Sequence, residues 1–132
     1  MIAFHQWIYA ATDGRIGHGL LGVPTLLLTT TGRRSGRPHT RALVYAEADR
    51  ELGVIASWGG SDRHPAWYLN LVDEPEVTVQ RRRTAAPYVA HVATGDERAR
   101  WWQRCDAVNR GRYTAYQQQT EREIPVVVLS PR

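Results

Sequence analysis

Short blocks of alternating or continuous hydrophobic residues run through the middle and the end of the chain, and blocks of this length are typical of strands. We expect six strands, over residues 25–31, 41–46, 52–57, 76–82, 88–93 and 125–129. The blocks at 76–82 and 88–93 are close enough to pair as a hairpin. The last block, PVVVL, is apolar throughout, as in a strand that is buried on both faces.

Four other segments have the spacing or the boundary residues of helices, and we expect helices over residues 2–11, 65–71, 94–108 and 113–120. Thr94 and Glu97 form the pattern of a capping box at the start of the third. The first is amphipathic, and glycines follow it up to about residue 20. It either packs against the domain or lies on a membrane surface or over a ligand.

Six strands with short inserted helices predict an α+β domain built on a mostly antiparallel sheet or small barrel. The length of 132 residues leaves room for a single domain, residues 1–132, and the 42% hydrophobic content is that of a globular protein. No repeat, low-complexity segment or linker interrupts the chain.

The composition adds an unusual charge balance, because all 17 cationic side chains are Arg and none is Lys. The net charge is +4, and the planar guanidinium fork suits phosphate and carboxylate groups. A single cysteine, Cys105, excludes an internal disulfide, and its place in a Trp-rich helix predicts that it is buried. Without a secretory signal or a membrane-spanning run, we expect a cytoplasmic protein, with membrane association through residues 2–11 as the alternative.

The densest cluster of polar chemistry is GRRSGRPHTR at residues 32–41, on a turn between two strands. Glycines let backbone N–H groups point at an anion, and Arg forks bind phosphate bidentately. The segment lacks the GK[ST] ending of a Walker loop. Three interpretations are open: a solvated hairpin tip, a site for an anionic small molecule or cofactor, and a nucleic-acid contact, to which 81–83 would add a second basic segment.

Three further segments combine aromatic and polar groups. ASWGG at 56–60 offers a hydroxyl, an indole and two glycines that let a planar group approach, although an ordinary turn explains it equally well. Trp67 and Asn70 lie one helical turn apart, as do Tyr113 and Tyr116, so each pair could line a pocket or simply pack in the core. The five histidines have no metal-ligand spacing, so we expect no metal site.

Four blocks in the order 26–41, 56–71, 74–79 and 116–131 resemble the deazaflavin-dependent nitroreductase family: LLLTTTGRRSGRPHTR, ASWGGSDRHPAWYLNL, EPEVTV and YQQQTEREIPVVVLSP. The resemblance covers about residues 20–131. It implies a split β-barrel, the deazaflavin coenzyme F420, and transfer of a hydride from the reduced coenzyme to a quinone, a nitroaromatic or an activated enone. The partner is then a small-molecule electron acceptor, and the protein a monomer or homodimer that binds no nucleic acid.

The resemblance also implies roles for individual residues. Phosphate contacts fall on Arg33, Arg34 and Ser35, with Arg41 compensating for His39, which stands where the family usually has Arg. Deazaflavin-ring contacts fall on Ala56, Ser57, Trp58, Gly59 and Gly60, and ring-side or substrate-side contacts on Ala66, Trp67 and Asn70. Ser57, Tyr113 and Tyr116 are the candidate catalytic residues, of which Ser57 and Tyr116 are the candidate proton donors.

Two departures from the family pattern concern the substrate side. Trp58 replaces a Lys or a small polar residue, which removes a cation and narrows the pocket, and Arg110 replaces a third pocket tyrosine. Because Trp58 could occlude the substrate side, one alternative is a non-catalytic F420-binding or carrier protein. A separate alternative is a split-barrel protein that binds FMN or haem.

Overall fold

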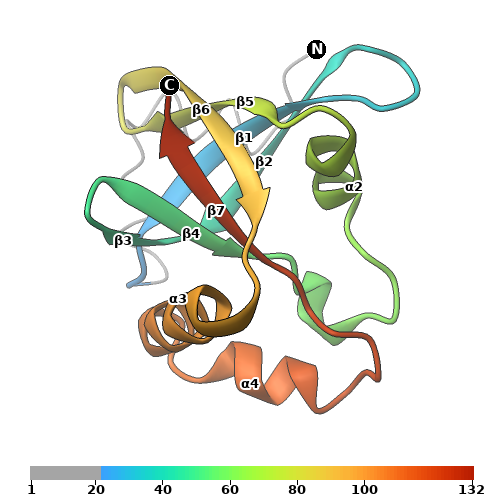
Figure 1. Cartoon of the computed structure of the whole chain (residues 1–132), viewed down its shortest axis with the longest axis vertical. Coiled ribbons are helices and arrows are strands. Elements are labelled where there is room, and N and C mark those ends of the chain that lie inside the picture. The colour runs from blue at the N-terminus through green and yellow to red at the C-terminus, as the bar shows by residue number, and fades with distance from the viewer. Residues whose placement is uncertain (1–21) are drawn as a thin grey trace.

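One antiparallel sheet of seven strands organises the chain in the order β2-β1-β5-β6-β7-β4-β3 (Figure 1). The computed structural model describes residues 22–132, so the predicted helix at 2–11 lies outside the described residues. The strands are β1 (Thr25–Thr31), β2 (Pro38–Val44), β3 (Ala46–Ala48), β4 (Glu51–Ile55), β5 (Glu76–Arg81), β6 (Thr84–Val92) and β7 (Val126–Pro131). The helical elements are the single turn η2 (Trp58–Gly60), α2 (Ala66–Asp73), α3 (Gly95–Val108) and α4 (Arg112–Gln117).

The sheet is curled, because its two edge strands are consecutive in the chain. β2 lies at one edge and β3 at the other, and only Tyr45 separates them. The Tyr45 N–H donates to the carbonyl oxygen of Pro24 at 3.2 Å, just before β1. The result is a half-barrel, which confirms the predicted α+β split-barrel fold.

The number of strands was predicted one too low, because the segment expected as one strand at 41–46 bends at Tyr45 and forms parts of both β2 and β3. β2 also begins earlier than predicted, at Pro38. Because Pro38 pairs with Thr31 and Val44 with Thr25, β2 pairs with β1 over the whole length of β1. Proline is tolerated there because β2 is an edge strand and needs no N–H donor on its outer side.

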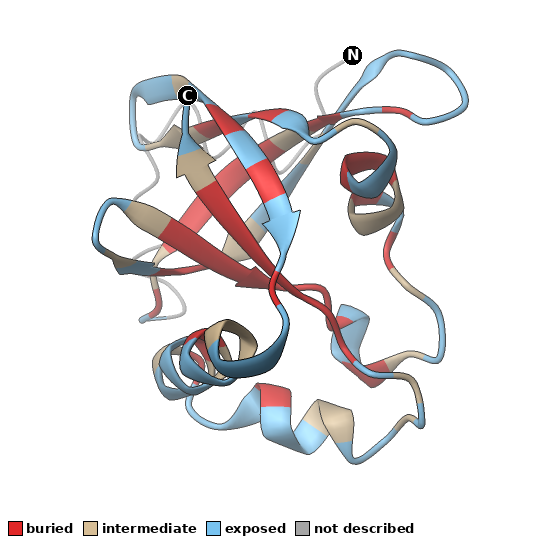
Figure 2. Cartoon of the chain, in the orientation of Figure 1, coloured by how far each residue is buried: buried red, intermediate tan, exposed pale blue. Residues whose placement is uncertain are grey.

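β7 is an interior strand of the sheet, between β6 and β4. Val126, Val127, Val128 and Leu129 are all completely buried, and Figure 2 shows the strand buried along most of its length. Val127 and Leu129 pack into one hydrophobic core, and Val126 and Val128 pack into another. The strand is therefore buried on both faces, as the apolar block predicted.

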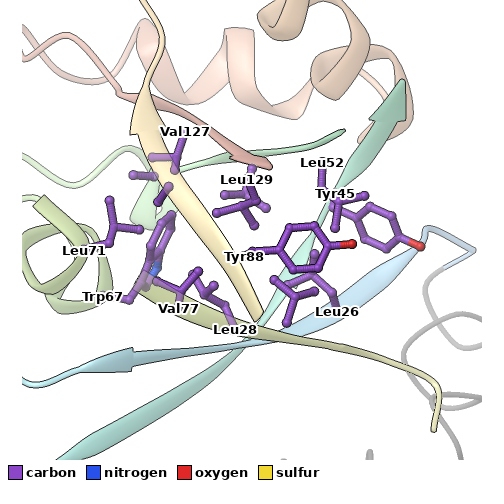
Figure 3. Close-up of a cluster of buried hydrophobic side chains, with 14 residues drawn as sticks. Leu26, Leu28, Tyr45, Leu52, Trp67, Leu71, Val77, Tyr88, Val127 and Leu129 are labelled. Atoms are coloured by element: carbon purple, nitrogen blue, oxygen red, sulfur yellow. The ribbon is translucent and has the colours of Figure 1, made fainter. Parts of the chain in front are cut away.

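The first core fills the concave side of the half-barrel and continues into α2 through Trp67 and Leu71 (Figure 3). The second lies beneath α3 and α4 and contains Trp101, Cys105 and Tyr113. Cys105 is buried, as predicted, and burial raises the pKa of its thiol to about 12. The thiol is therefore protonated at neutral pH and suits packing rather than nucleophilic attack.

The start of α3 is where the sequence predicts it, but the predicted capping box is wrong. Thr94 occupies the N-cap position without a side-chain hydrogen bond to the helix. The Glu97 carboxylate instead binds Nε2 of His91, at 3.0 Å, near the end of β6. A neighbouring strand thus provides a partner that the local sequence pattern does not reveal.

Candidate functional site

A tight turn between β1 and β2 presents the cluster of arginines. The Gly32 N–H donates to Arg37 O at 2.7 Å, and the Gly36 N–H donates to Gly32 O at 2.8 Å, which closes the turn. Residues 33–37 are all exposed, whereas Gly32 is buried. A Cβ at position 32 would lie 2.6 Å from Ser35 Oγ and 2.7 Å from His39 Nε2, so these two side chains meet over this glycine.

Asn70 of α2 connects the arginine turn to the rest of the protein. Its side chain is 2% exposed, and its Oδ1 accepts hydrogen bonds from the backbone N–H and the guanidinium of Arg33 at 3.1 and 3.2 Å. Its Nδ2 donates to Thr30 Oγ1 at 3.2 Å. Asn70 therefore fixes the direction in which the turn leaves β1, and Arg33 has one of its donors already engaged.

A pocket of about 480 Å³ opens beside the edge strand β2 and the first turn of α2. The predicted site residues that line it are Arg41, Ser57, Trp58, Ala66, Trp67 and Tyr113. Leu43, Val44, Ile55 and Pro65 add an apolar surface. α2 joins this pocket to the arginine turn, because Ala66 and Trp67 line the pocket while Asn70, one turn further on, holds Arg33.

The other predicted residues lie around this pocket without lining it. Arg33, Arg34, Ser35 and His39 belong to the arginine turn and the start of β2, and Asn70 lies beneath that turn. The segment after β4 contains Ala56, Gly59 and Gly60. Tyr116 of α4 lies against Gly60. The structure thus gathers the predicted residues into two adjacent places, a basic turn and an aromatic pocket.

Ser57 brings a buried hydroxyl to the pocket. The residue is 8% exposed, and its carbonyl accepts hydrogen bonds from the Gly60 N–H and from Arg122. Within residues 22–132, no group forms a hydrogen bond with its Oγ. A buried hydroxyl needs a partner, so this group can form a hydrogen bond with a polar atom that enters the pocket.

The turn after Ser57 has a left-handed backbone over three successive residues. The φ angles are 44° at Trp58, 62° at Gly59 and 82° at Gly60. Gly60 is required for space as well, because a Cβ there would lie 2.8 Å from the carbonyl oxygen of Tyr116. Trp58 is 58% exposed, so its indole stands at the mouth of the pocket rather than filling it.

The two tyrosines of α4 have different places. Tyr113 is buried and lines the pocket, and burial raises the pKa of its phenol while a hydrogen bond with Asn109 opposes the shift. Tyr116 is half-buried and contacts the Tyr113 ring edge-on, with 6.3 Å between ring centroids. Asp106 Oδ1 accepts the backbone N–H groups of Tyr113 and Thr114, which fixes the start of α4.

Three residues around the pocket were missed by sequence reasoning. Asn109 lowers the pKa of the Tyr113 phenol, against the effect of burial, and Arg122 donates a hydrogen bond to His64 near the turn that follows Ser57. Arg122 lies within TEREIP, where flanking acids make it look like a solvated surface residue. Its place in the ordered C-terminal block of the resemblance was the one available signal.

Arg81, the first residue of the second basic segment, has its own partners on β3 and at the bend after β2. Arg81 forms an ion pair with Glu47 at 3.1 Å and lies 5.8 Å from the centre of the Tyr45 ring. Among residues 22–132, no three His, Cys, Asp or Glu side chains are grouped as a metal would require. In the same part of the chain, no helix is long and apolar enough to cross a membrane.

A half-barrel with a basic turn and an aromatic pocket beside its edge strand β2 has the architecture of the split-barrel class of proteins. The chain belongs to the F420H2-dependent quinone reductase family, whose model matches residues 2–131. It is 43% identical to an F420H2-dependent quinone reductase of Mycobacterium tuberculosis, over the whole chain and 91% of that relative. A second M. tuberculosis protein, a putative F420H2-dependent quinone reductase, is 40% identical over 89% of this chain and 99% of its own length.

Solved structures agree with this placement. An F420H2-dependent reductase, FDR-A, matches with a TM-score of 0.75 and 35% identity, over 81% of this chain and 94% of its own. A protein described as a domain-swapped dimer matches with a TM-score of 0.76 and 30% identity, over 97% and 100%. The haem storage protein HutZ of Vibrio cholerae shares only the fold, at 15% identity and a TM-score of 0.57 over 83% of this chain and 82% of its own.

These comparisons confirm the predicted family resemblance, the cofactor F420, and the expectation that the chain is an F420H2-dependent reductase.

Proposed function

We propose that the protein transfers a hydride from reduced F420 to a quinone that enters the pocket beside β2 and α2. The observation that carries this proposal is the buried Ser57 hydroxyl, which has no partner among residues 22–132 and lies on an aromatic pocket of about 480 Å³. Bound F420 supplies the hydride, and the acceptor also takes up a proton to become a hydroquinone.

The arginine turn is the proposed phosphate site. Arg33, Arg34 and Ser35 are exposed on a closed glycine turn, and Arg guanidinium groups bind phosphate through paired hydrogen bonds. Asn70 holds Arg33 and so limits its motion before the ligand arrives, which lowers the entropy lost on binding. His39, packed with Ser35 over Gly32, and Arg41 at the pocket edge complete the proposed set.

The aromatic pocket is the proposed place for the ring and the acceptor. Ala56, Gly59 and Gly60 shape the turn that carries Ser57, and Ala66 and Trp67 provide a wall on α2. Trp58 stands at the mouth, where its indole can stack on a planar acceptor. This arrangement selects flat, partly apolar molecules, so quinones are the first expectation, and nitroaromatics and activated enones are acceptors of the same shape.

Three hydroxyl groups are the proposed proton donors or hydrogen-bond donors to the acceptor. Ser57 and Tyr113 line the pocket, and Tyr116 adjoins Tyr113. The raised pKa of Tyr113 keeps its phenol protonated at neutral pH. It can therefore donate a hydrogen bond to an acceptor oxygen on which negative charge develops.

The test is a turnover assay with purified protein, reduced F420 and menadione, in which the absorbance of oxidised F420 is followed. We expect a rate above the protein-free control, with weaker acceptors among nitroimidazoles and enones. Arg34→Ala should weaken F420 binding, measured by fluorescence titration, whereas Arg100→Ala on the exposed face of α3 should not. Equal affinities for the two variants would contradict the proposed phosphate site.

A carrier protein is the second candidate, because Trp58 is exposed at the mouth of the pocket and could limit access by an acceptor. Tight F420 binding without turnover of any acceptor class would favour it. Turnover that appears only in Trp58→Ala would identify the indole as the barrier.

Assembly as a monomer or a homodimer is a separate prediction. A related structure is a domain-swapped dimer, and light scattering of the purified protein would distinguish the two states.

A further inference from the structure

A single guanidinium holds together the segment that carries Ser57 and Trp58. Arg122 donates from Nε to Ser61 O at 2.6 Å, from Nη2 to Ser57 O at 2.7 Å and from Nη1 to Ala56 O at 3.2 Å. Its Nη1 also lies 3.2 Å from Nδ1 of His64. One side chain therefore binds acceptors on both sides of the left-handed turn.

That turn needs external support. Trp58 has φ of 44°, a conformation that a residue with a side chain rarely adopts, and Gly59 after it has φ of 62°. Within the turn, only the Gly60 N–H to Ser57 O and the Ser61 N–H to Trp58 O bonds connect the backbone to itself. The bonds from Arg122 to the carbonyls of Ser57 and Ser61 connect the two ends of the turn through one side chain, and the Ala56 N–H bond to Pro125 O at 3.0 Å adds a further contact before it.

Arg122 is itself held in place. Its carbonyl accepts from Gln117 Nε2 at 2.7 Å, and Gln117 Oε1 accepts the Ile124 N–H at 2.9 Å. Thr120 Oγ1 accepts the Arg122 N–H at 3.2 Å and donates to Asp62 Oδ1 at 2.7 Å. The segment between α4 and β7 is thus tied both to α4 and to the residues after the turn.

The support of the arginine turn is independent of this arrangement. Arg33 is held by Asn70, and Asn70 by Thr30. Arg122 forms no hydrogen bond with any of the three. The two halves of the site can therefore be disturbed separately.

We propose that Arg122 is a positioning residue, which holds Ser57 and Trp58 in the conformation that receives the acceptor. It contributes little to the affinity for the F420 phosphate. Only the expected change in kcat rests on the proposed function. The loss of Arg122 should lower kcat for the acceptor while the Kd for F420 changes little. It should also loosen the turn itself, whether or not the acceptor is a quinone.

The test compares Arg122→Gln and Arg122→Lys with the matched control Arg98→Gln. Arg98 also donates to one backbone carbonyl, Ile124 O at 2.8 Å, but touches no residue of the turn. With menadione and saturating reduced F420, we expect kcat to fall by about tenfold or more in Arg122→Gln. The Kd for F420 should stay within about threefold, and Arg122→Lys should recover part of kcat. Arg98→Gln should keep kcat within about twofold of the starting protein.

A second measurement does not depend on activity. Hydrogen exchange of the Gly60 and Ser61 amides should be faster in both Arg122 variants and unchanged in Arg98→Gln. Unchanged exchange in the Arg122 variants would overturn the inference, and so would wild-type kcat in Arg122→Gln. If Arg122→Gln does not fold, Arg122→Lys carries the same comparison. Absence of turnover in the unmodified protein would count against the proposed function, while the exchange result would still decide the role of Arg122.

Discussion

The carboxamide oxygen of Asn70 accepts two hydrogen bonds from Arg33, one from its backbone and one from its guanidinium. This relationship joins a helix to a turn 37 positions earlier in the chain, and it aligns an exposed basic turn with the pocket next to it. The buried amide is therefore as much a part of the proposed phosphate site as the arginines themselves.

Asn70→Ala should weaken F420 binding by about tenfold, because each lost hydrogen bond costs on the order of 1 kcal/mol and Arg33 becomes free to move. The measurement is a fluorescence titration with oxidised F420. Thr30→Val removes only the support of the Asn70 amide nitrogen, so its effect should be smaller. A larger loss in Thr30→Val than in Asn70→Ala would contradict the role given to Arg33.

Removal of single hydroxyl groups should separate the candidate proton donors. Ser57→Ala, Tyr113→Phe and Tyr116→Phe each remove one oxygen with little change of shape. We expect the donor that touches the acceptor to cost at least about tenfold in kcat, and Ser57 and Tyr113 to cost more than Tyr116, since only these two line the pocket. Steady-state rates with menadione decide the order, and equal rates in all three variants would point to solvent as the proton source.

His64 should make the protein less stable as the pH falls. Burial, followed by the charge of Arg122, lowers the pKa of His64 below its ordinary value of 6.5. Below about pH 6.5 the unfolded chain therefore binds a proton at this site more readily than the folded protein, so the free energy of unfolding decreases.

His64→Asn keeps a hydrogen-bond acceptor for Arg122 but does not titrate. Urea unfolding between pH 8 and pH 5 should show a smaller loss of stability in His64→Asn than in the unmodified protein. Identical pH dependence of the two midpoints would mean that another group is responsible.

Gly53→Ala should destabilise the fold by about 1–3 kcal/mol, the cost of overpacking a filled core. Gly53 lies on β4, and a Cβ there would overlap the six-membered ring of Trp101 from α3. Denaturant titration measures the loss. In the Trp101→Phe background the same substitution should cost less, since the smaller ring leaves space, and a strictly additive double variant would show that the two residues do not compete for volume.

The sequence predicts what depends on local periodicity. β1 has the predicted bounds, Thr25–Thr31, because its apolar residues and the glycine turn after it are contiguous in the chain. The bend at Tyr45 was not predictable in this way. It arises from the closure of the half-barrel, in which the Tyr45 N–H reaches the carbonyl of Pro24.

In the candidate site too, residues in contiguous motifs were predicted from the sequence, and residues brought together from distant positions were not. Ser57, Trp58 and the arginine turn are contiguous motifs that can be read directly. Arg122 lies 65 positions after Ser57, and no local pattern connects a charged residue in TEREIP with the carbonyl of a distant strand end. Glu97 shows the opposite error, because its local pattern suggested a helix cap while His91 offered a closer partner.

The position of β7 between β6 and β4 has a consequence for how the protein is made. During translation, β4 and β6 leave the ribosome before the strand that belongs between them. Until Val126–Pro131 emerges, their inner edges expose unpaired backbone groups beside apolar side chains such as Leu52, Val54 and Ala90. Such edges favour intermolecular pairing. The nascent chain is therefore most prone to aggregation just before its final strand arrives, and Arg122 reaches the segment around Ser57 at nearly the same moment.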